Sequence, residues 1–235
     1  LFVVAPGIFD RHPDYIVGCV LARGVENTRA YPAIDALLDT AEAALRADFA
    51  DADLKEQPAI AVWRAAFAAR GWTPSKYPAS VEALTKRVAK GSPLPHINPI
   101  VDLGNAVVLR WLTPVGAHDL AQLGGAPLTV RDACAGDTFS PMGDAPSESP
   151  DAGEVVYAAG QVVRTRRWVW RQASDALVTP DTRDVFFPVD GFGGQTDERV
   201  RLAVEQLATA CREIFGASVA TGLVSRDAPS FSPDR

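Results

Sequence analysis

The segment from Gly91 to Leu120, GSPLPHINPIVDLGNAVVLRWLTPVGAHDL, has the clearest boundaries in the chain. Three prolines precede its apolar run: Pro93, Pro95 and Pro99. Proline fixes φ and is tolerated in the first turn of a helix. Pro114 and Gly116 then break the run. The sequence therefore predicts a helix from Pro99 to about Leu112, held between two structured turns.

Asp102 and Asn105 lie inside this predicted helix, three residues apart and hence on one face. Such a pair, together with Asn98 at the helix start, is suited to contact a ligand. In the alternative interpretation, these side chains hydrogen-bond the neighbouring loop backbone, because buried polar groups must be satisfied.

His118 and Asp119 directly follow the break and are the candidate catalytic residues. A histidine can act as a general base and an aspartate can orient it. Adjacent residues in a loop rarely point at each other. In the alternative interpretation, Asp119 therefore caps a short helical turn while His118 is partly exposed.

The segment Arg164–Gln172, RTRRWVWRQ, mixes arginine with tryptophan. As a single strand it places alternate residues on one face: Arg164, Arg166, Trp168, Trp170 and Gln172. Tryptophan beside arginine is suited to stack on a base or an aromatic ligand while arginine contacts phosphate. In the alternative, both tryptophans pack in the core and the arginines extend to solvent.

The remaining chain predicts an α+β fold. Helices are expected after Pro32, Pro58 and Pro78, and strands at Leu1–Ala5, Tyr15–Arg23, within 128–189 and at Ser218–Val224. We expect one domain over residues 1–235, with a helix-rich part at about 26–112, a strand-rich part at about 126–192 and a last helix at about 196–215. Helices and strands do not alternate, which argues against a doubly wound sheet. The tail from Asp227 is expected to be loose.

Composition limits the possible functions. The chain of 235 residues is 47% hydrophobic and has no apolar run long enough to predict a membrane span. A net charge of −6 argues against broad nucleic-acid binding, DNA included, but leaves room for a local basic face. Three cysteines (Cys19, Cys134 and Cys211) predict no disulfide framework, which favours a cytoplasmic location.

Neither a metal nor a cofactor is predicted. His12 and His96 have no partner at ligand spacing in the sequence, and the chain has only three histidines. The Gly191–Gly194 run lacks the downstream glycine and lysine of phosphate-binding loops, so it predicts a turn.

The order of these segments resembles the B3/B4 domain of the phenylalanyl-tRNA synthetase β subunit, and more closely the freestanding proteins made of this domain alone. The resemblance covers about residue 10 to about residue 220 and is carried by Leu94–Asn105, Glu154–Tyr157, Arg167–Gln172 and Asp181–Val185. It implies a mixed or antiparallel sheet packed with helices, tRNA binding, and hydrolysis of a mischarged aminoacyl ester.

This sequence departs from the family pattern at two positions. The family's editing histidine falls on Gly116, with His118 two residues later. The family's glutamate that recognises the tyrosine hydroxyl falls on Pro188. Specificity for a tyrosyl ester is therefore not expected.

Two sets of site residues follow. The expected substrate pocket comprises Asn98, Asp102, Asn105, Gly116, Trp168, Trp170, Arg171, Gln172 and Thr182. The expected tRNA phosphate contacts are Lys86, Arg87, Lys90, Arg164 and Arg166.

Three functions remain open. The first is a freestanding enzyme that deacylates mischarged tRNA in trans; ester hydrolysis needs only a positioned water and oxyanion stabilisation, so the catalytic residue stays undefined. The second is a non-catalytic module that binds RNA or an amino acid, and the third is a structural protein whose tryptophans are core. The chain has no adenylate-forming module, so it is not a complete phenylalanine–tRNA ligase. The amino acid, the tRNA and the oligomeric state stay open.

Overall fold

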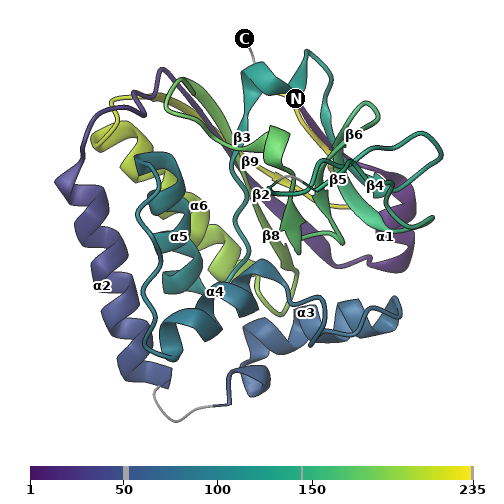
Figure 1. The fold of residues 1–235 in the computed structure, drawn as a ribbon, viewed down its shortest axis with the longest axis horizontal. Coiled ribbons are helices and arrows are strands. Elements are labelled where there is room, and N and C mark those ends of the chain that lie inside the picture. Colours follow the sequence, from purple (N-terminus) through teal and green to yellow (C-terminus); the bar gives the residue numbers. More distant parts are fainter. Residues whose placement is uncertain (50–52, 144, 234–235) are drawn as a thin grey trace.

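The computed structural model describes residues 1–49, 53–143 and 145–233. The fold is α+β, as predicted, with strands gathered on one side and long helices on the other (Figure 1). The helices are α1 (Pro6–Arg11), α2 (Pro32–Phe49), α3 (Pro58–Ala69), α4 (Ser80–Ala89), α5 (Pro99–Trp111) and α6 (Asp197–Glu213). Across these described ranges, no helix has the length and apolar character needed to cross a membrane.

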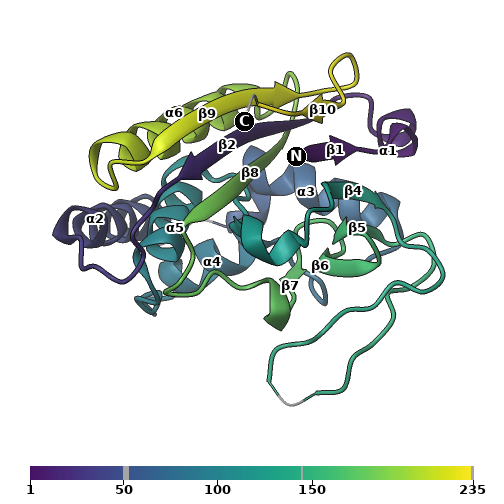
Figure 2. The same ribbon diagram turned by 90° about the horizontal axis from the view of Figure 1, so that it is seen from above.

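The strands form a four-stranded and a six-stranded sheet, which Figure 2 shows from above. The four-stranded sheet has the order β3 (His118–Asp119), β8 (Asp184–Phe192), β2 (Tyr15–Arg23) and β9 (Ser218–Val224). The six-stranded sheet has the order β10 (Ser230–Phe231), β1 (Phe2–Val4), β4 (Leu128–Asp132), β5 (Val155–Ala159), β6 (Val162–Arg166) and β7 (Arg171–Gln172). β1 and β4 are parallel, whereas the other pairs are antiparallel.

Strand β2 has its predicted bounds and is buried on both faces. Val17, Cys19 and Leu21 pack in the core that includes the six-stranded sheet. Val20 and Ala22 pack in a second core with residues of α5 and α6. Gly18 permits the close approach of α6, because a Cβ there would lie only 2.4 Å from a methyl group of Val204.

Helix α5 has the predicted position and lies between α2 and α6 (Figure 1). The Asn98 side chain caps it by accepting a hydrogen bond from the Val101 amide at 3.1 Å. Pro99 occupies the first turn, and Leu112 ends the helix in the left-handed region with φ 51°.

The segment Arg164–Gln172 is not the single strand that its composition predicts. β6 ends at Arg166, the chain turns, and β7 returns antiparallel to it. Arg167 and Trp168 have φ of 42° and 65°, a strained conformation for residues other than glycine. A residue outside the turn holds this backbone in place, because the Arg167 amide donates to the Glu154 carboxylate at 2.9 Å. The predicted alternation of the tryptophans on one face is therefore wrong.

The predicted loose tail also needs correction. Ser230–Phe231 form β10, which pairs with β1, and the Phe231 ring stacks on Phe186 at 6.1 Å. Burial of this aromatic ring outweighs the polar, proline-containing composition of the segment. Residues 234–235 lie outside the described part of the chain.

Candidate functional site

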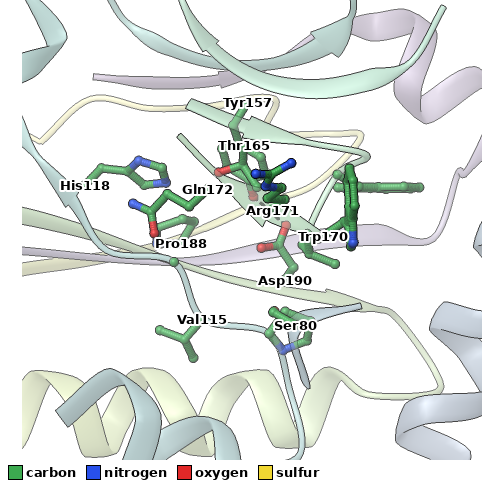
Figure 3. Close-up of a pocket in the computed structure, with 14 residues that line it drawn as sticks. Ser80, Val115, His118, Tyr157, Thr165, Trp170, Arg171, Gln172, Pro188 and Asp190 are labelled. Carbon is green, nitrogen blue, oxygen red and sulfur yellow. Dashed lines mark hydrogen bonds between the residues drawn. The ribbon is translucent and has the colours of Figure 1, made fainter. Parts of the chain in front are cut away.

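A cavity of about 80 Å³ lies between the two sheets, close to the start of α4. It has room for several water molecules or one small organic group. In Figure 3 the rings of His118 and Trp170 lie on opposite sides, with Arg171 and Asp190 between them. The lining residues are Ser80, Pro114, Val115, Gly116, His118, Tyr157, Thr165, Trp168, Val169, Trp170, Arg171, Gln172, Pro188 and Asp190.

Asp190 is the buried carboxyl group of this cavity. Its backbone is fixed in β8, because its amide donates to the Pro114 carbonyl at 3.0 Å and its own carbonyl accepts from the Thr113 hydroxyl at 2.7 Å. Its Oδ1 accepts hydrogen bonds from the hydroxyls of Tyr15 and Tyr157. Both partners are neutral, so the carboxyl group has no buried cation to pair with in this network.

The environment of Asp190 changes its acidity. Burial raises the pKa of Asp190 to about 7, although the two tyrosine hydroxyls act in the opposite direction. Both protonation states are therefore populated near neutral pH. Such a carboxyl group is able to accept and return a proton during a reaction.

His118 is buried and stacks on Tyr157, with ring centroids 5.8 Å apart. Desolvation, with a further contribution from Arg164, lowers the pKa of His118 to about 3. Its Nδ1 is buried without a hydrogen-bond partner in the described part of the chain. The ring is thus neutral and weakly basic, and the expected partial exposure of His118 is wrong.

Asp119 does not orient His118. One of its oxygens accepts from the Ala121 amide at 2.9 Å, which caps the short 3₁₀ helix Leu120–Leu123, and the other accepts from the Thr182 hydroxyl at 2.7 Å. The capping alternative is confirmed for Asp119. Thr182 is occupied by this bond and does not line the cavity.

The turn after β6 contributes two different tryptophans. Trp168 is fully buried and packs edge-on against Tyr15 at 4.8 Å. Trp170 is half-buried and packs edge-on against Tyr77 at 4.9 Å. The core alternative thus holds for Trp168, although its ring also borders the cavity, whereas Trp170 forms a partly open wall.

Arg171 is the cation of the cavity. Within the described ranges its guanidinium makes no ion pair or side-chain hydrogen bond, and it lies 5.9 Å from the Trp170 ring and 5.8 Å from the Phe139 ring. Gln172, the next residue, donates to the carbonyls of Ala117 and Ala176 at 3.1 and 2.8 Å. Gln172 therefore braces the wall, while Arg171 is available to a ligand.

Gly116 and Pro188, the two departures from the family pattern, are neighbours in the cavity wall. The Gly116 amide donates to the Pro188 carbonyl at 2.9 Å. A Cβ at position 116 would lie 3.0 Å from the Pro188 ring and 3.1 Å from Nε2 of His118. A histidine at position 116 therefore requires these neighbours to move.

The structure brings together only part of the predicted pocket. Gly116, His118, Trp168, Trp170, Arg171 and Gln172 line the cavity. Asn98, Asp102 and Asn105 lie on or at the start of α5 and do not line it. Asp102 instead accepts hydrogen bonds from the Ile97 amide at 3.0 Å and from His96 at 3.1 Å. The alternative in which Asp102 satisfies loop backbone is confirmed.

Arg164 and Arg166 do not reach the surface as expected for phosphate contacts. Arg164 donates to the carbonyls of Asp175 and Gln122 at 2.8 and 2.6 Å. Arg166 forms two hydrogen bonds with Glu154, at 2.9 and 2.7 Å. Their guanidinium groups are buried and already hydrogen-bonded, so the expectation that they contact tRNA phosphate is wrong. Lys86, Arg87 and Lys90 are exposed on α4 and its C-terminal end.

Sequence reasoning missed Asp190 and the two tyrosines that bind it. The available signal was the run VFFPVDGF, in which one carboxylate interrupts a strand of apolar residues. Burying such a group is costly unless hydrogen bonds satisfy it, so an isolated aspartate in an apolar strand indicates a specific site.

Two comparisons relate the chain to known proteins, and a third does not. A search of curated protein sequences gave no match. Among solved structures, an N-terminal fragment of the phenylalanyl-tRNA synthetase β subunit from Pyrococcus horikoshii is similar, with a TM-score of 0.48 and 12% identity. That alignment covers 92% of this chain and 49% of the fragment, so the chain spans about half of the fragment's length. The B3/4 domain matches residues 62–219. This match confirms the resemblance predicted from the sequence, and the chain belongs to the B3/4 domain family.

Proposed function

We propose that this protein binds tRNA and hydrolyses the ester bond of a mischarged aminoacyl-tRNA in trans. The observation that supports this best is a small cavity that combines a carboxyl group titrating near neutral pH, Asp190, with the guanidinium of Arg171, which has no ion pair among the described residues. The activity is also the one that the family resemblance implies. We further propose a cytoplasmic location and a reaction without a cofactor.

In the proposed reaction, the aminoacyl group enters the cavity and a water molecule approaches the ester carbonyl. Asp190, as carboxylate, accepts a proton from this water while the oxygen of the water attacks the carbonyl carbon. The bond between that carbon and the ribose oxygen then breaks, and Asp190 returns the proton to this oxygen, which departs as the ribose hydroxyl. Tyr15 and Tyr157 keep the carboxyl group in place through both steps.

His118 has a different proposed role from the one its position in the sequence suggested. Its lowered pKa makes it a poor proton acceptor at neutral pH. Its neutral ring, stacked on Tyr157, instead shapes one side of the amino-acid site. We therefore propose Asp190 and not His118 as the general base.

Arg171 supplies positive charge beside Trp170. A guanidinium with free donors binds phosphate or a developing oxyanion through charge-assisted hydrogen bonds. Lys86, Arg87 and Lys90 remain the proposed contacts for the tRNA backbone. They follow Ser80, which lines the cavity, by six to ten residues, or about 9–15 Å along a helix.

The test is release of labelled amino acid from a panel of mischarged tRNAs, with wild type beside Trp170→Ala and the surface control Arg201→Ala. Turnover on one ester that is reduced only in Trp170→Ala supports an editing site in this cavity. No release above buffer from any ester would sink the proposed activity.

A non-catalytic binding module is the second candidate, and Gly116 is the observation that favours it. The family's editing histidine is absent there, and a side chain at this position would require Pro188 or His118 to move. Saturable, salt-sensitive tRNA binding without turnover would identify the chain as such a module.

A further inference from the structure

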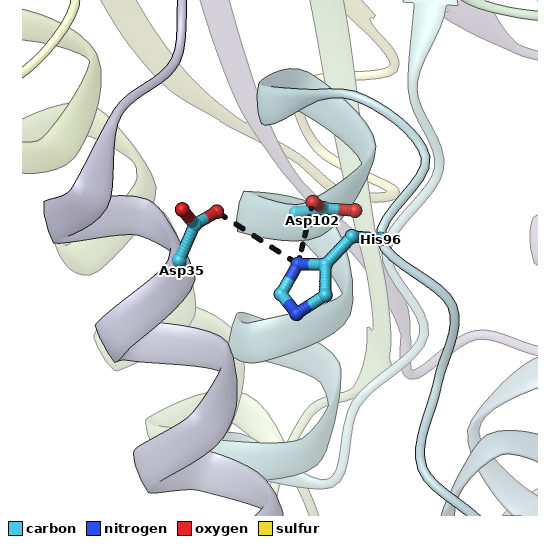
Figure 4. A group of neighbouring side chains, drawn as sticks. All are labelled: Asp35, His96 and Asp102. Atoms are coloured by element: carbon cyan, nitrogen blue, oxygen red, sulfur yellow. Dashed lines mark hydrogen bonds and ion pairs between the residues drawn. The ribbon is translucent and has the colours of Figure 1, made fainter.

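Asp35, His96 and Asp102 form a side-chain cluster where the segment before α5 meets α2, and none of the three lines the cavity. Figure 4 shows the His96 ring between Asp35 on α2 and Asp102 on α5. Nδ1 of His96 lies 3.1 Å from Oδ2 of Asp102 and 3.8 Å from Oδ1 of Asp35. The three ligand-type atoms lie within 4.8 Å of one another.

These distances fit a small divalent cation. A tetrahedral Zn²⁺ ion with bonds of about 2.0–2.1 Å places its ligand atoms about 3.4 Å apart. The two separations from Nδ1, 3.1 and 3.8 Å, lie on either side of this value. Modest side-chain rotation therefore suffices to bring one nitrogen and two oxygens around one ion.

The three side chains differ in exposure in a way that suits metal entry. The Asp102 side chain is 4% exposed and is fixed by the hydrogen bond from the Ile97 amide to its Oδ1. The side chains of His96 and Asp35 are 50% and 55% exposed. A rigid carboxylate thus anchors the site, while the two outer ligands leave room for water on the ion.

Charge around the ring favours a cation. The carboxylates of Asp35 and Asp102 both face Nδ1 of His96. No ion pair connects Asp35 or Asp102 to lysine or arginine among the described residues. Within the described part of the chain, no lysine or arginine therefore balances the negative charge of these two carboxylates.

We propose that Asp35, His96 and Asp102 bind a borderline divalent transition cation of the Zn²⁺ class, with water completing its coordination. Imidazole with carboxylate oxygens is a donor set that suits such ions, whereas Mg²⁺ and Ca²⁺ prefer oxygen ligands alone. The ion joins the segment before α5 to α2. This site is independent of the proposed deacylation, because none of its ligands lines the cavity.

The test is calorimetric titration of the full chain with Zn²⁺, and with Co²⁺ followed by its visible absorption. We expect one equivalent of either metal, tetrahedral Co²⁺ bands, and a rise in Tm with Zn²⁺, because a ligand that binds only the folded state stabilises it. His96→Gln and Asp35→Asn should each weaken binding at least tenfold. Both residues are exposed, so neither change threatens folding.

Asp48→Asn is the matched control, since it removes an exposed carboxylate at the far end of α2. It should bind Zn²⁺ like wild type. The proposal is overturned by the absence of one-equivalent binding, or by binding that His96→Gln and Asp35→Asn leave unchanged. Tighter binding of Mg²⁺ or Ca²⁺ than of Zn²⁺ would also overturn it. None of these results depends on tRNA, so they do not bear on the proposed function.

Discussion

Glu154 and Asp190 are both buried carboxylates beside strand β5, yet their partners differ. Glu154 accepts two hydrogen bonds from the guanidinium of Arg166, at 2.9 and 2.7 Å, and one from the Arg167 amide. Asp190 accepts only from the neutral hydroxyls of Tyr15 and Tyr157. A charged partner keeps a carboxylate ionised and gives it a structural role, whereas neutral partners allow it to gain and lose a proton. Four experiments test this difference.

Glu154→Ala should have the largest effect, and on stability. It leaves the buried Arg166 without its main partner, and breaking a buried ion pair in this way costs about 3–5 kcal/mol. We expect this loss in the free energy of unfolding by urea denaturation. Glu205→Gln, at an exposed pair on α6, is the control and should leave the midpoint unchanged. Equal midpoints for Glu154→Ala and wild type would show that the pair is not structural.

Asp190→Asn should act mainly on the reaction. The amide keeps the shape of the carboxyl group and can still accept from the tyrosines, but it cannot take a proton. Loss of a general base lowers kcat by about 10²-fold or more. Deacylation kinetics measure this, with circular dichroism and the urea midpoint as checks on folding. A kcat close to wild type would remove Asp190 from the mechanism.

Arg171→Ala should have a smaller effect and lower kcat/KM about tenfold. This factor corresponds to the lower end of the free energies that hydrogen bonds to charged groups contribute. A rise in KM would indicate a contact with substrate phosphate, and a fall in kcat would indicate oxyanion stabilisation. Arg201→Ala on the α6 surface serves as the charge-matched control. Because Arg171 has no ion pair among the described residues, its removal should leave stability close to wild type.

Local signals allowed the helices and strand β2 to be predicted. Pro58 and Pro99 start helices within the first turn, and Gly216 follows the last one. Such signals act between residues that are close in the chain, so they can be read without the fold. The pocket residues around Gly116 and Arg171 came from the resemblance to the family.

The incorrect or missing predictions have one physical cause. Contacts between residues that are far apart in the sequence override the local conformational preference of the chain. The turn at Arg167 is held by Glu154, 13 residues earlier, although its own residues favour a strand. Tyr15 and Asp190 are 175 residues apart, so no spacing in the sequence indicates their hydrogen bond. Asp35 and His96 are likewise far apart in the sequence, yet Asp35 approaches the His96 ring from α2.

The smallest expected effect is a shift in the pH dependence of deacylation, and it tests most directly whether Asp190 is set apart by its neutral partners. Activity should rise with pH through about 7, because the reaction needs the carboxylate form and burial raises the pKa of Asp190 to about 7. The Tyr157 hydroxyl stabilises that carboxylate and so lowers its pKa. Tyr157→Phe should therefore move the inflection to higher pH, while Tyr77→Phe, outside this network, should leave it unchanged. The opposite shift would mean that the proton acceptor is another group.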